Sequence, residues 1–272
     1  MIGARRSAAR RIASGQRVAL SRTRRVVDAG ALTVLITDSG PDVLSCALVT
    51  DPVHPVDPAA VAEAVVATRT SLEGRRVRIE LVQCCPAGMA EALQAAGLEV
   101  TERPVLLAAA PDELRAPALA EGVRLVPVDS VTRRDQVDAV CAEAFGQAVG
   151  SGAPPLPPEP ALGGSVLALR GDTPVAAASW TAVGEGTSEV VGVATVPAER
   201  RRGLGSVVTA GAAAGAASGG ADLVWLTPGD NGAQRIYLGL GFGEVGAAVH
   251  LAEPDPASET APPEPAVATG IG

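Results

Sequence analysis

The chain has 272 residues, enough for one large domain or two smaller ones. Apolar residues make up 47% of it, so a sizeable core can form, but aromatic residues make up only 2%, so Ala, Val and Leu must build that core. Every cation is Arg, and eight of the 22 lie in residues 1–25, which hold no acid, so the rest carries a net charge of −16. An acidic body argues against nucleic acid as the main partner and suits an amine-bearing substrate.

The sequence also bears on the cellular environment. No apolar run resembles a membrane span or the core of a signal peptide. Cys46, Cys84, Cys85 and Cys141 match no zinc-site spacing, and we interpret them as small buried residues in a reducing compartment. We therefore expect a cytoplasmic protein with no metal and no membrane partner.

Residues 1–29 form a basic N-terminal arm. Such an arm can bind nucleic acid or a membrane surface, or serve as a transit peptide. The alternative is a poorly ordered leader, and we favour it because runs of like charge are usually solvated.

Hydrophobic patterns and turn residues predict alternating strands and helices along the first half of the chain. The two strands 31–37 and 43–50 are separated by Asp38-Ser39-Gly40-Pro41-Asp42, which favours a hairpin. The elements that follow are helix 58–72, strand 77–82, helix 88–96, strand 100–107 (broken by Pro104) and a connection over 108–121.

The second half shows a fuller set of elements. They are strand 123–128, a helix from Asp129 or Ser130 to Phe145, a Gly/Pro-rich loop over 150–164, hairpin strands 165–169 and 174–183, strand 189–196, helix 204–218, strand 222–227, helix 231–240 and strand 245–251. Residues 252–272 hold five Pro, four acids and no base, a composition typical of a disordered tail.

The turn between strand 189–196 and helix 204–218 is rich in Arg and Gly. A helix N-terminus has unpaired backbone N–H groups and a partial positive charge, and glycine lets a ligand approach that backbone. The turn therefore predicts an anion site, most naturally for a pyrophosphate. The alternative is a plain turn with a solvated charge cluster.

The two halves also repeat at an offset of 144 residues. Gly97-Leu98 falls on Gly241-Phe242, and helix 58–72 falls on the helix that opens near Gly203. The first copy lacks the opening strand and helix of the second, and it carries Asp57 and Pro58 in place of the Arg/Gly turn. An acid repels phosphate and proline removes a backbone donor, so only the second copy is expected to keep the site.

These motifs resemble the GNAT superfamily of acyl-CoA-dependent N-acyltransferases. Arg200-Arg201-Arg202-Gly203-Leu204-Gly205 is similar to its pyrophosphate loop, and the segment from Ala233 through Tyr237 to Gly241-Phe242 is similar to its second signature. The resemblance implies an α/β fold (an α+β mixed sheet flanked by helices) in a tandem arrangement. The expected parts are a degenerate unit over 30–108, a linker over 109–121, a catalytic unit over 122–251 and the tail.

The resemblance also implies the cofactor site. Acetyl-CoA would place its diphosphate on the turn and its pantetheine arm along the preceding strand, where an N–H near Thr195 or Val196 could polarise the thioester carbonyl. Asn231 would cap its helix and contact the arm, a role that varies in the family. The residues implied are Ala194, Thr195, Val196, Arg200, Arg201, Arg202, Gly203, Leu204, Gly205, Ser206 and Asn231.

The acceptor amine must lose a proton before it attacks, and a carboxylate can accept it. Glu189 stands where many family members carry an acid, with Glu185 as the second candidate and a solvated strand-end charge as the alternative. Tyr237 stands at the family's proton-donor position, with a packing role as the alternative. We interpret His250 as structural, and Trp180 and Trp225 as core or cleft residues.

The expected function is N-acetyl transfer from acetyl-CoA to a small amine or a protein N-terminus by direct attack in a ternary complex. One alternative is a non-catalytic acyl-CoA-binding module that regulates a partner, and a weaker one is a nucleic-acid-associated protein that uses the Arg arm. The sequence leaves a homodimer open.

Overall fold

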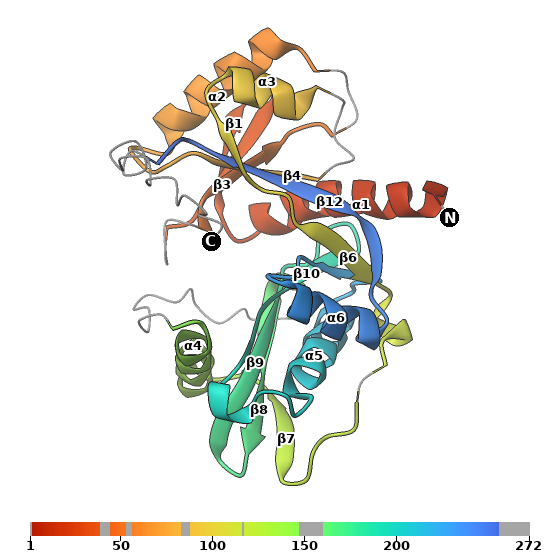
Figure 1. The fold of residues 1–272 in the computed structure, drawn as a ribbon. Coiled ribbons are helices and arrows are strands. Elements are labelled where there is room, and N and C mark those ends of the chain that lie inside the picture. Colours follow the sequence, from red (N-terminus) through yellow and green to blue (C-terminus); the bar gives the residue numbers. More distant parts are fainter. Residues whose placement is uncertain are drawn as a thin grey trace, which may run out of the picture.

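The structure is a computed structural model that describes residues 2–38, 44–52, 56–82, 88–115, 117–146 and 160–255, with side chains from Ser7 onward and without that of residue 160. A mixed sheet runs through the molecule with helices on its faces (Figure 1), which confirms the predicted fold class. The expectations for Cys84 and Cys85, most of loop 150–164 and the tail beyond residue 255 fall outside the described residues.

The first half of the chain holds three helices and six strands among the described residues. They are α1 (Ile2–Ser21), β1 (Arg25–Ala29), β2 (Leu32–Ile36), β3 (Cys46–Val49), α2 (Pro58–Ser71), β4 (Arg78–Val82), α3 (Met89–Ala95), β5 (Glu99–Glu102) and β6 (Val105–Ala109). The expected strand 100–107 is therefore two strands, split at Pro104, because proline cannot donate to a ladder.

The second half begins after the 3-10 turn η2 (Pro111–Glu113). Its elements are β7 (Val123–Pro127), α4 (Val131–Phe145), η3 (Pro160–Leu162), β8 (Gly163–Arg170), β9 (Thr173–Thr181), β10 (Thr187–Thr195), η4 (Pro197–Glu199), α5 (Leu204–Ser218), β11 (Leu223–Leu226), α6 (Asn231–Leu240) and β12 (Gly243–Ala252). Helices α5 and α6 have the predicted bounds. Gly203 precedes the first residue of α5 and Gly241 follows the last residue of α6, both in left-handed conformations.

The two halves use the same strand pairing. In the first, β1, β2 and β3 are antiparallel neighbours and β3 runs parallel to β4. In the second, β8, β9 and β10 are antiparallel neighbours and β10 runs parallel to β11. This shared pairing supports the repeat inferred from the sequence.

The last strands of the halves are exchanged. β6 of the first half pairs with β11 of the second, and β12 of the second half pairs with β4 and β5 of the first. β6 and β12 also pair with each other, so a 12-stranded sheet continues from one half into the other. The strand over 105–109, assigned from sequence to the first unit, thus completes the sheet of the second.

The expectation of a poorly ordered basic leader was wrong. Residues 2–21 form helix α1, which lies across the junction of the halves and packs against β4, β10 and β12 (Figure 1). Its buried residues are Ala9, Ile12, Gly15, Gln16, Ala19 and Leu20, which share one face at helical spacing. The arginines between them hide this apolar stripe in a count of charge along the sequence.

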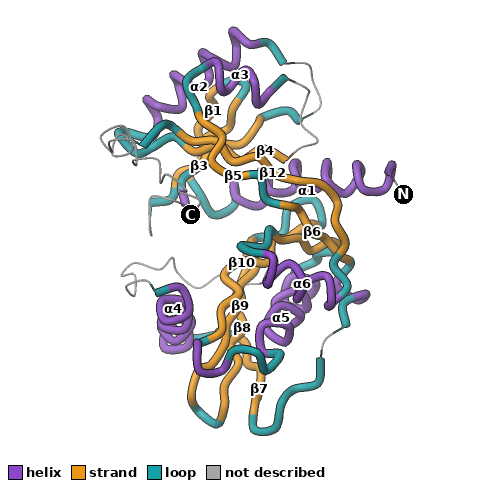
Figure 2. Tube along the Cα trace, viewed as in Figure 1, coloured by secondary structure: helices purple, strands orange, loops and turns teal. Residues whose placement is uncertain are grey.

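Helix α1 also corrects the comparison of the halves. It precedes β1 as α4 precedes β8, so the first half keeps the helix that we expected it to lack. Only β7 has no counterpart among the described residues. Figure 2 shows α2 and α3 together over the first half, and α4 apart from α5 and α6 in the second.

Candidate active site

Strands β10 and β11 separate after a short contact. They pair only from Thr187 to Glu189, whereas β10 continues to pair with β9 as far as Thr195. A bulge at Gly192, which has a φ of 61°, bends β10 along this free stretch. One edge of β10 beyond Glu189 therefore has no strand partner among the described residues, and its backbone groups are available to a ligand.

The N-terminus of α5 lies just beyond this free edge. Its N-cap is Gly203, with a φ of 77° and no side-chain capping bond, so the first N–H groups of the helix keep their donor capacity. Arg201 also has a positive φ, 62°. Successive backbone turns of this kind form a concave array of N–H donors that suits anions.

The glycines of this turn differ in what they require. A side chain at Gly203 would meet no neighbour within 4 Å, so the constraint there is the left-handed backbone and not space. A Cβ at Gly205 would lie 3.9 Å from Thr195 Oγ1, an ordinary contact. The position of Gly203 is therefore the more restrictive one.

The three arginines of the turn have different partners. Arg200 donates to the backbone carbonyls of Ala144 at 2.7 Å and Thr195 at 3.2 Å, which ties the turn to α4 and β10. Arg202 lies 3.3 Å from Glu199, which also accepts two hydrogen bonds from Arg170 and is held at a lowered pKa by them. The Arg170 contact neutralises the acid nearest to the predicted anion site.

The corresponding turn of the first half, at the start of α2, has a different structure. Asp57 is the N-cap of α2 and accepts a hydrogen bond from Ala59 N at 3.0 Å, and Pro58 occupies the first turn. The acid thus takes up a donor that a phosphate would need.

Glu189 lies at the last paired position of β10 and β11, opposite Trp225. Its backbone N–H donates to Thr181 Oγ1 at 3.0 Å. Burial raises the pKa of Glu189 to about 8, with help from the negative charge of Glu80 and against the effect of Arg24. The exposed Glu185 stands outside the strand, in the tight turn before it, with a φ of 48°.

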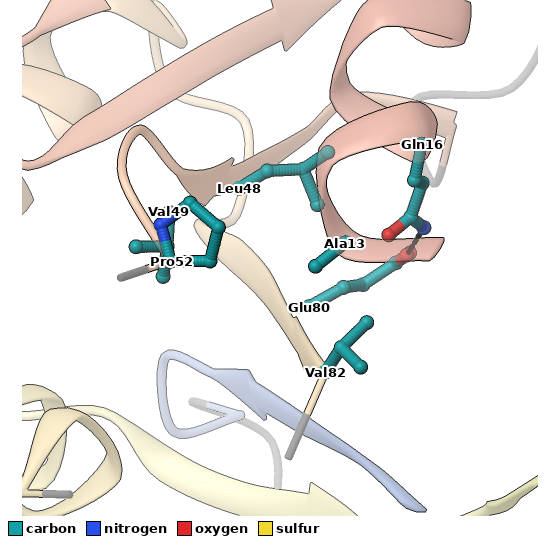
Figure 3. A pocket seen from close by; sticks show the side chains of 7 residues that line it. All are labelled: Ala13, Gln16, Leu48, Val49, Pro52, Glu80 and Val82. Carbon is teal, nitrogen blue, oxygen red and sulfur yellow. Dashed lines mark hydrogen bonds between the residues drawn. The ribbon is translucent and has the colours of Figure 1, made fainter. Parts of the chain in front are cut away.

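Glu80 comes from β4 of the first half. Gln16 of α1, which is only 7% exposed, donates from Nε2 to Glu80 Oε2 at 2.8 Å (Figure 3). The cavity beside this pair, lined by Ala13, Leu48, Val49, Pro52 and Val82 as well, holds about 10 Å³. That is room for about one water molecule, so it is not a substrate pocket.

Tyr237 lies on the opposite side of β10 from Glu189. Val190, next to Glu189, pairs with Trp180, whose ring packs against Gly215 of α5. Tyr237 belongs to α6, which packs against α5 on that same side, and its ring lies edge-on to Phe242 at 6.1 Å. Burial raises its pKa to about 12, so the phenol keeps its proton at neutral pH.

Two predicted roles are corrected by the structure. The N-cap of α6 is Asp230, which accepts from Ala233 N at 2.7 Å, so Asn231 is the first helical residue and not the cap. The N–H of Val196 donates to Val175 O at 3.0 Å, so it is not free to polarise a carbonyl. Because successive N–H groups of a strand point to opposite edges, that of Thr195 points to the free edge of β10.

The remaining predicted residues have structural surroundings. Trp180 and Trp225 are both buried in the core. His250 lies on β12 opposite Glu80, 3.5 Å from Glu102. Cys46 and Cys141 are free thiols whose pKa values burial raises to about 12 and about 11.

Sequence reasoning missed Glu80 and Gln16, since no motif marks them and only the exchange of strands brings them near Glu189.

Two kinds of feature are absent from the described residues. No group of three or more His, Cys, Asp or Glu side chains is arranged to hold a metal ion. None of the described helices combines the length and apolar character that crossing a membrane requires.

Comparisons with known proteins agree on one family. The family model "FR47-like protein" matches residues 166–250. A GCN5-related N-acetyltransferase from Kribbella flavida is 42% identical, with 91% of this chain and 96% of that chain covered and a TM-score of 0.80. No curated protein matches the chain.

Two more distant solved structures share the fold. One is a GCN5-related N-acetyltransferase from Sphaerobacter thermophilus, 16% identical, with a TM-score of 0.57 and coverage of 82% of this chain and 76% of that one. The other is a tandem GNAT protein from the clavulanic acid biosynthesis pathway, 15% identical, with a TM-score of 0.54 and coverage of 81% and 77%.

Proposed function

The chain belongs to the GCN5-related N-acetyltransferase family, and from that premise we propose that it transfers an acetyl group from acetyl-CoA to a primary amine by direct attack in a ternary complex. The observation that carries the proposal is the free edge of β10, which leads directly to the uncapped N-terminus of α5. An extended arm that ends in a pyrophosphate has the shape and charge to fit such an edge.

The turn residues bind and orient the cofactor in this proposal. The pyrophosphate oxygens accept hydrogen bonds from the first N–H groups of α5, those of Gly203, Leu204, Gly205 and Ser206. The exposed side chains of Arg201 and Arg202 add positive charge. Arg200 contributes its backbone to the turn, and its side chain keeps the turn in place by donating to the carbonyls of Thr195 and Ala144. The backbone of Ala194 and Thr195 pairs with the pantetheine arm, and the Thr195 N–H polarises the thioester carbonyl. Asn231 stays a proposed contact for the arm.

Glu189 is the proposed general base. Its raised pKa, about 8, lies close to the range in which a base can accept the proton of an ammonium group and release it again. The amine then attacks the thioester carbonyl carbon, and a tetrahedral intermediate forms. When the intermediate collapses, the C–S bond breaks and Tyr237, on the other side of β10, gives its proton to the departing thiolate. Because Tyr237 stays protonated at neutral pH, it is ready to donate.

The proposed acceptor class follows from charge. Outside residues 1–25 the chain is strongly acidic, which favours a cationic acceptor such as a small amine or a protein N-terminus. We propose direct transfer rather than a covalent cysteine relay, since burial keeps both described thiols, Cys46 and Cys141, protonated and therefore poorly nucleophilic. We place one active site in each chain, since α2 begins with Asp57 and Pro58.

The test is the release of CoA thiol from acetyl-CoA with a panel of amines. Amine-dependent release that falls strongly in Tyr237→Phe is the expected result. Tight CoA binding by calorimetry without amine-dependent thiol release would instead identify a non-catalytic acyl-CoA-binding module. Salt-dependent binding of a DNA duplex would point to the nucleic-acid role of the basic N-terminal segment.

A further inference from the structure

Strand β1 is an outer strand of the sheet, with β2 as its one strand partner among the described residues. In the second half the corresponding strand, β8, is not an outer strand, because β7 pairs with it antiparallel over Val123 to Pro127. Among the described residues, the position beside β1 is therefore unoccupied, whereas β7 fills the corresponding position beside β8.

The contacts of β7 show which side chains anchor a strand at the position beside β8. Leu125 lies on the surface of α5, where a Cβ added to Gly211 would come within 2.5 Å of its Cδ2 atom. Arg124 reaches the turn between β8 and β9, where it donates to Gly171 O at 3.3 Å and pairs with Asp172 at 2.9 Å. A basic residue followed by an aliphatic one therefore anchors β7 to the turn and to the helix.

The first half has a groove at the matching place. It holds about 470 Å³ and is lined by the β1–β2 turn, including Asp28, and by α2, where Ala60, Glu63 and Ala67 are exposed or half-buried. Val26 on β1, close to this turn, is 47% exposed. The groove thus combines a free strand edge, a shallow helix surface of small residues and two carboxylates.

We propose that this groove docks an extended segment of a partner polypeptide, which pairs antiparallel with β1 and places an aliphatic side chain on α2 and a neighbouring Arg or Lys at Asp28 and Glu63. Three features carry the proposal: the open edge of β1, the acidic lining, and the example that β7 gives on the same framework. Addition of a strand to an exposed sheet edge is a common mode of peptide recognition. Residues 252–272 of the chain itself hold four acids and no base, so charge disfavours them as the occupant.

The probe is a fluorescent peptide with the sequence of residues 121–128, Glu-Gly-Val-Arg-Leu-Val-Pro-Val, added to the full-length protein. We expect saturable binding in the micromolar range and slowed amide hydrogen exchange in β1. A peptide with Glu in place of the Arg should bind at least about 10-fold more weakly, since its charge would face Asp28 and Glu63.

Protein variants locate the binding on the groove. Glu63→Lys and Ala67→Trp should each weaken binding at least about 10-fold, the first by charge and the second by filling the groove. Glu91→Lys makes the same charge change on α3, outside the groove, and should leave binding unchanged. Thermal melting of each variant shows that it is folded, and the exposed position of Glu63 keeps that variant informative if Ala67→Trp unfolds.

Three outcomes overturn the proposal. They are the absence of saturable peptide binding, binding that Glu63→Lys does not weaken, and a dimer in sedimentation experiments that Glu63→Lys dissociates. The last would assign the groove to a second copy of the chain.

Discussion

The charge of Glu80 on β4 acts on Glu189 of β10 across the boundary between the two halves of the chain. Gln16 holds Glu80 by a 2.8 Å hydrogen bond, and the charge of Glu80 adds to burial in raising the pKa of Glu189 to about 8. Arg24 opposes both effects. A residue of the first half thus tunes the candidate base of the second half.

The first prediction concerns the pH dependence of acetyl transfer. Only deprotonated Glu189 can accept a proton, so kcat/KM should rise with pH and level off above about pH 8. Glu80→Gln should move this limb to lower pH, because removing the nearby negative charge makes Glu189 easier to ionise. Glu189→Gln should lower kcat by about 10²-fold or more. The measurement is thiol release from acetyl-CoA between pH 6 and 9.5.

Glu185→Gln is the matched control, since it makes the same change four residues away at an exposed position. It should keep both the rate and the pH profile. If Glu185→Gln abolished the rise of kcat/KM with pH while Glu189→Gln stayed active, Glu185 and not Glu189 would be the base.

The second prediction concerns stability and uses the same shift. Because the pKa of Glu189 is higher in the folded chain than in the unfolded chain, the folded state binds one more proton between about pH 4.5 and 8. This proton stabilises the folded state fully below about pH 4.5, and the stabilisation is lost as the pH rises through about 8. Glu189→Gln mimics the protonated form and should be more stable than wild type at pH 9. Because Glu189 is only half-buried, we expect a gain on the order of 2 kcal/mol, less than the full pKa shift would give.

Urea denaturation at pH 5 and pH 9 measures this difference. The gain from Glu189→Gln should be smaller at pH 5. An equal gain at both values would mean that the substitution acts by packing and not by titration.

The third prediction concerns the proton donor. Tyr237→Phe keeps the ring that packs against Phe242 but removes the hydroxyl. We expect kcat to fall about 10²-fold, since a general acid contributes roughly that much, while the KM for acetyl-CoA and the melting temperature stay near wild type. An acetyl thioester of a more acidic thiol should restore the activity of the variant, because its thiolate can leave without being protonated. Wild-type activity in Tyr237→Phe would leave the residue with a packing role only.

The fourth prediction separates backbone strain from charge at the cofactor turn. Gly203→Asn and Gly203→Asp have similar shapes, and both must adopt a φ of 77°, which Asn and Asp tolerate better than most residues. Only Gly203→Asp places a negative charge at the N-terminus of α5, so it should weaken CoA binding much more than Gly203→Asn. Calorimetric titration with CoA measures both, and equal affinities would argue against a pyrophosphate at this turn.

The fifth prediction concerns the domains. Since β6 completes the sheet beside β11 and β12 completes it beside β4, neither half has a full sheet of its own. Thermal unfolding of the whole chain should therefore be one cooperative transition, with equal calorimetric and van't Hoff enthalpies. Two separate transitions would support the independent units over 30–108 and 122–251 that the sequence suggested.

The sequence by itself was sufficient for most of the local structure, though not for helix α1, and for the family. The Gly and Pro residues at segment ends and the apolar periodicity determined α5 and α6 to the residue, because capping and the left-handed φ of Gly203 and Gly241 are local properties. The Arg/Gly turn and the spacing to Tyr237 indicated the family for the same reason.

Only the tertiary structure decided which elements meet. The exchange of β6 and β12, the docking of α1 and the approach of Glu80 to Glu189 depend on contacts between residues far apart in the chain. Such contacts leave no periodic signal, since an exchanged strand has the same alternating pattern as one that stays in its own half. For α1 the physical reason is that one apolar face is buried against the sheet, while Arg11 pairs with Asp222 and donates to Glu185 O of the second half.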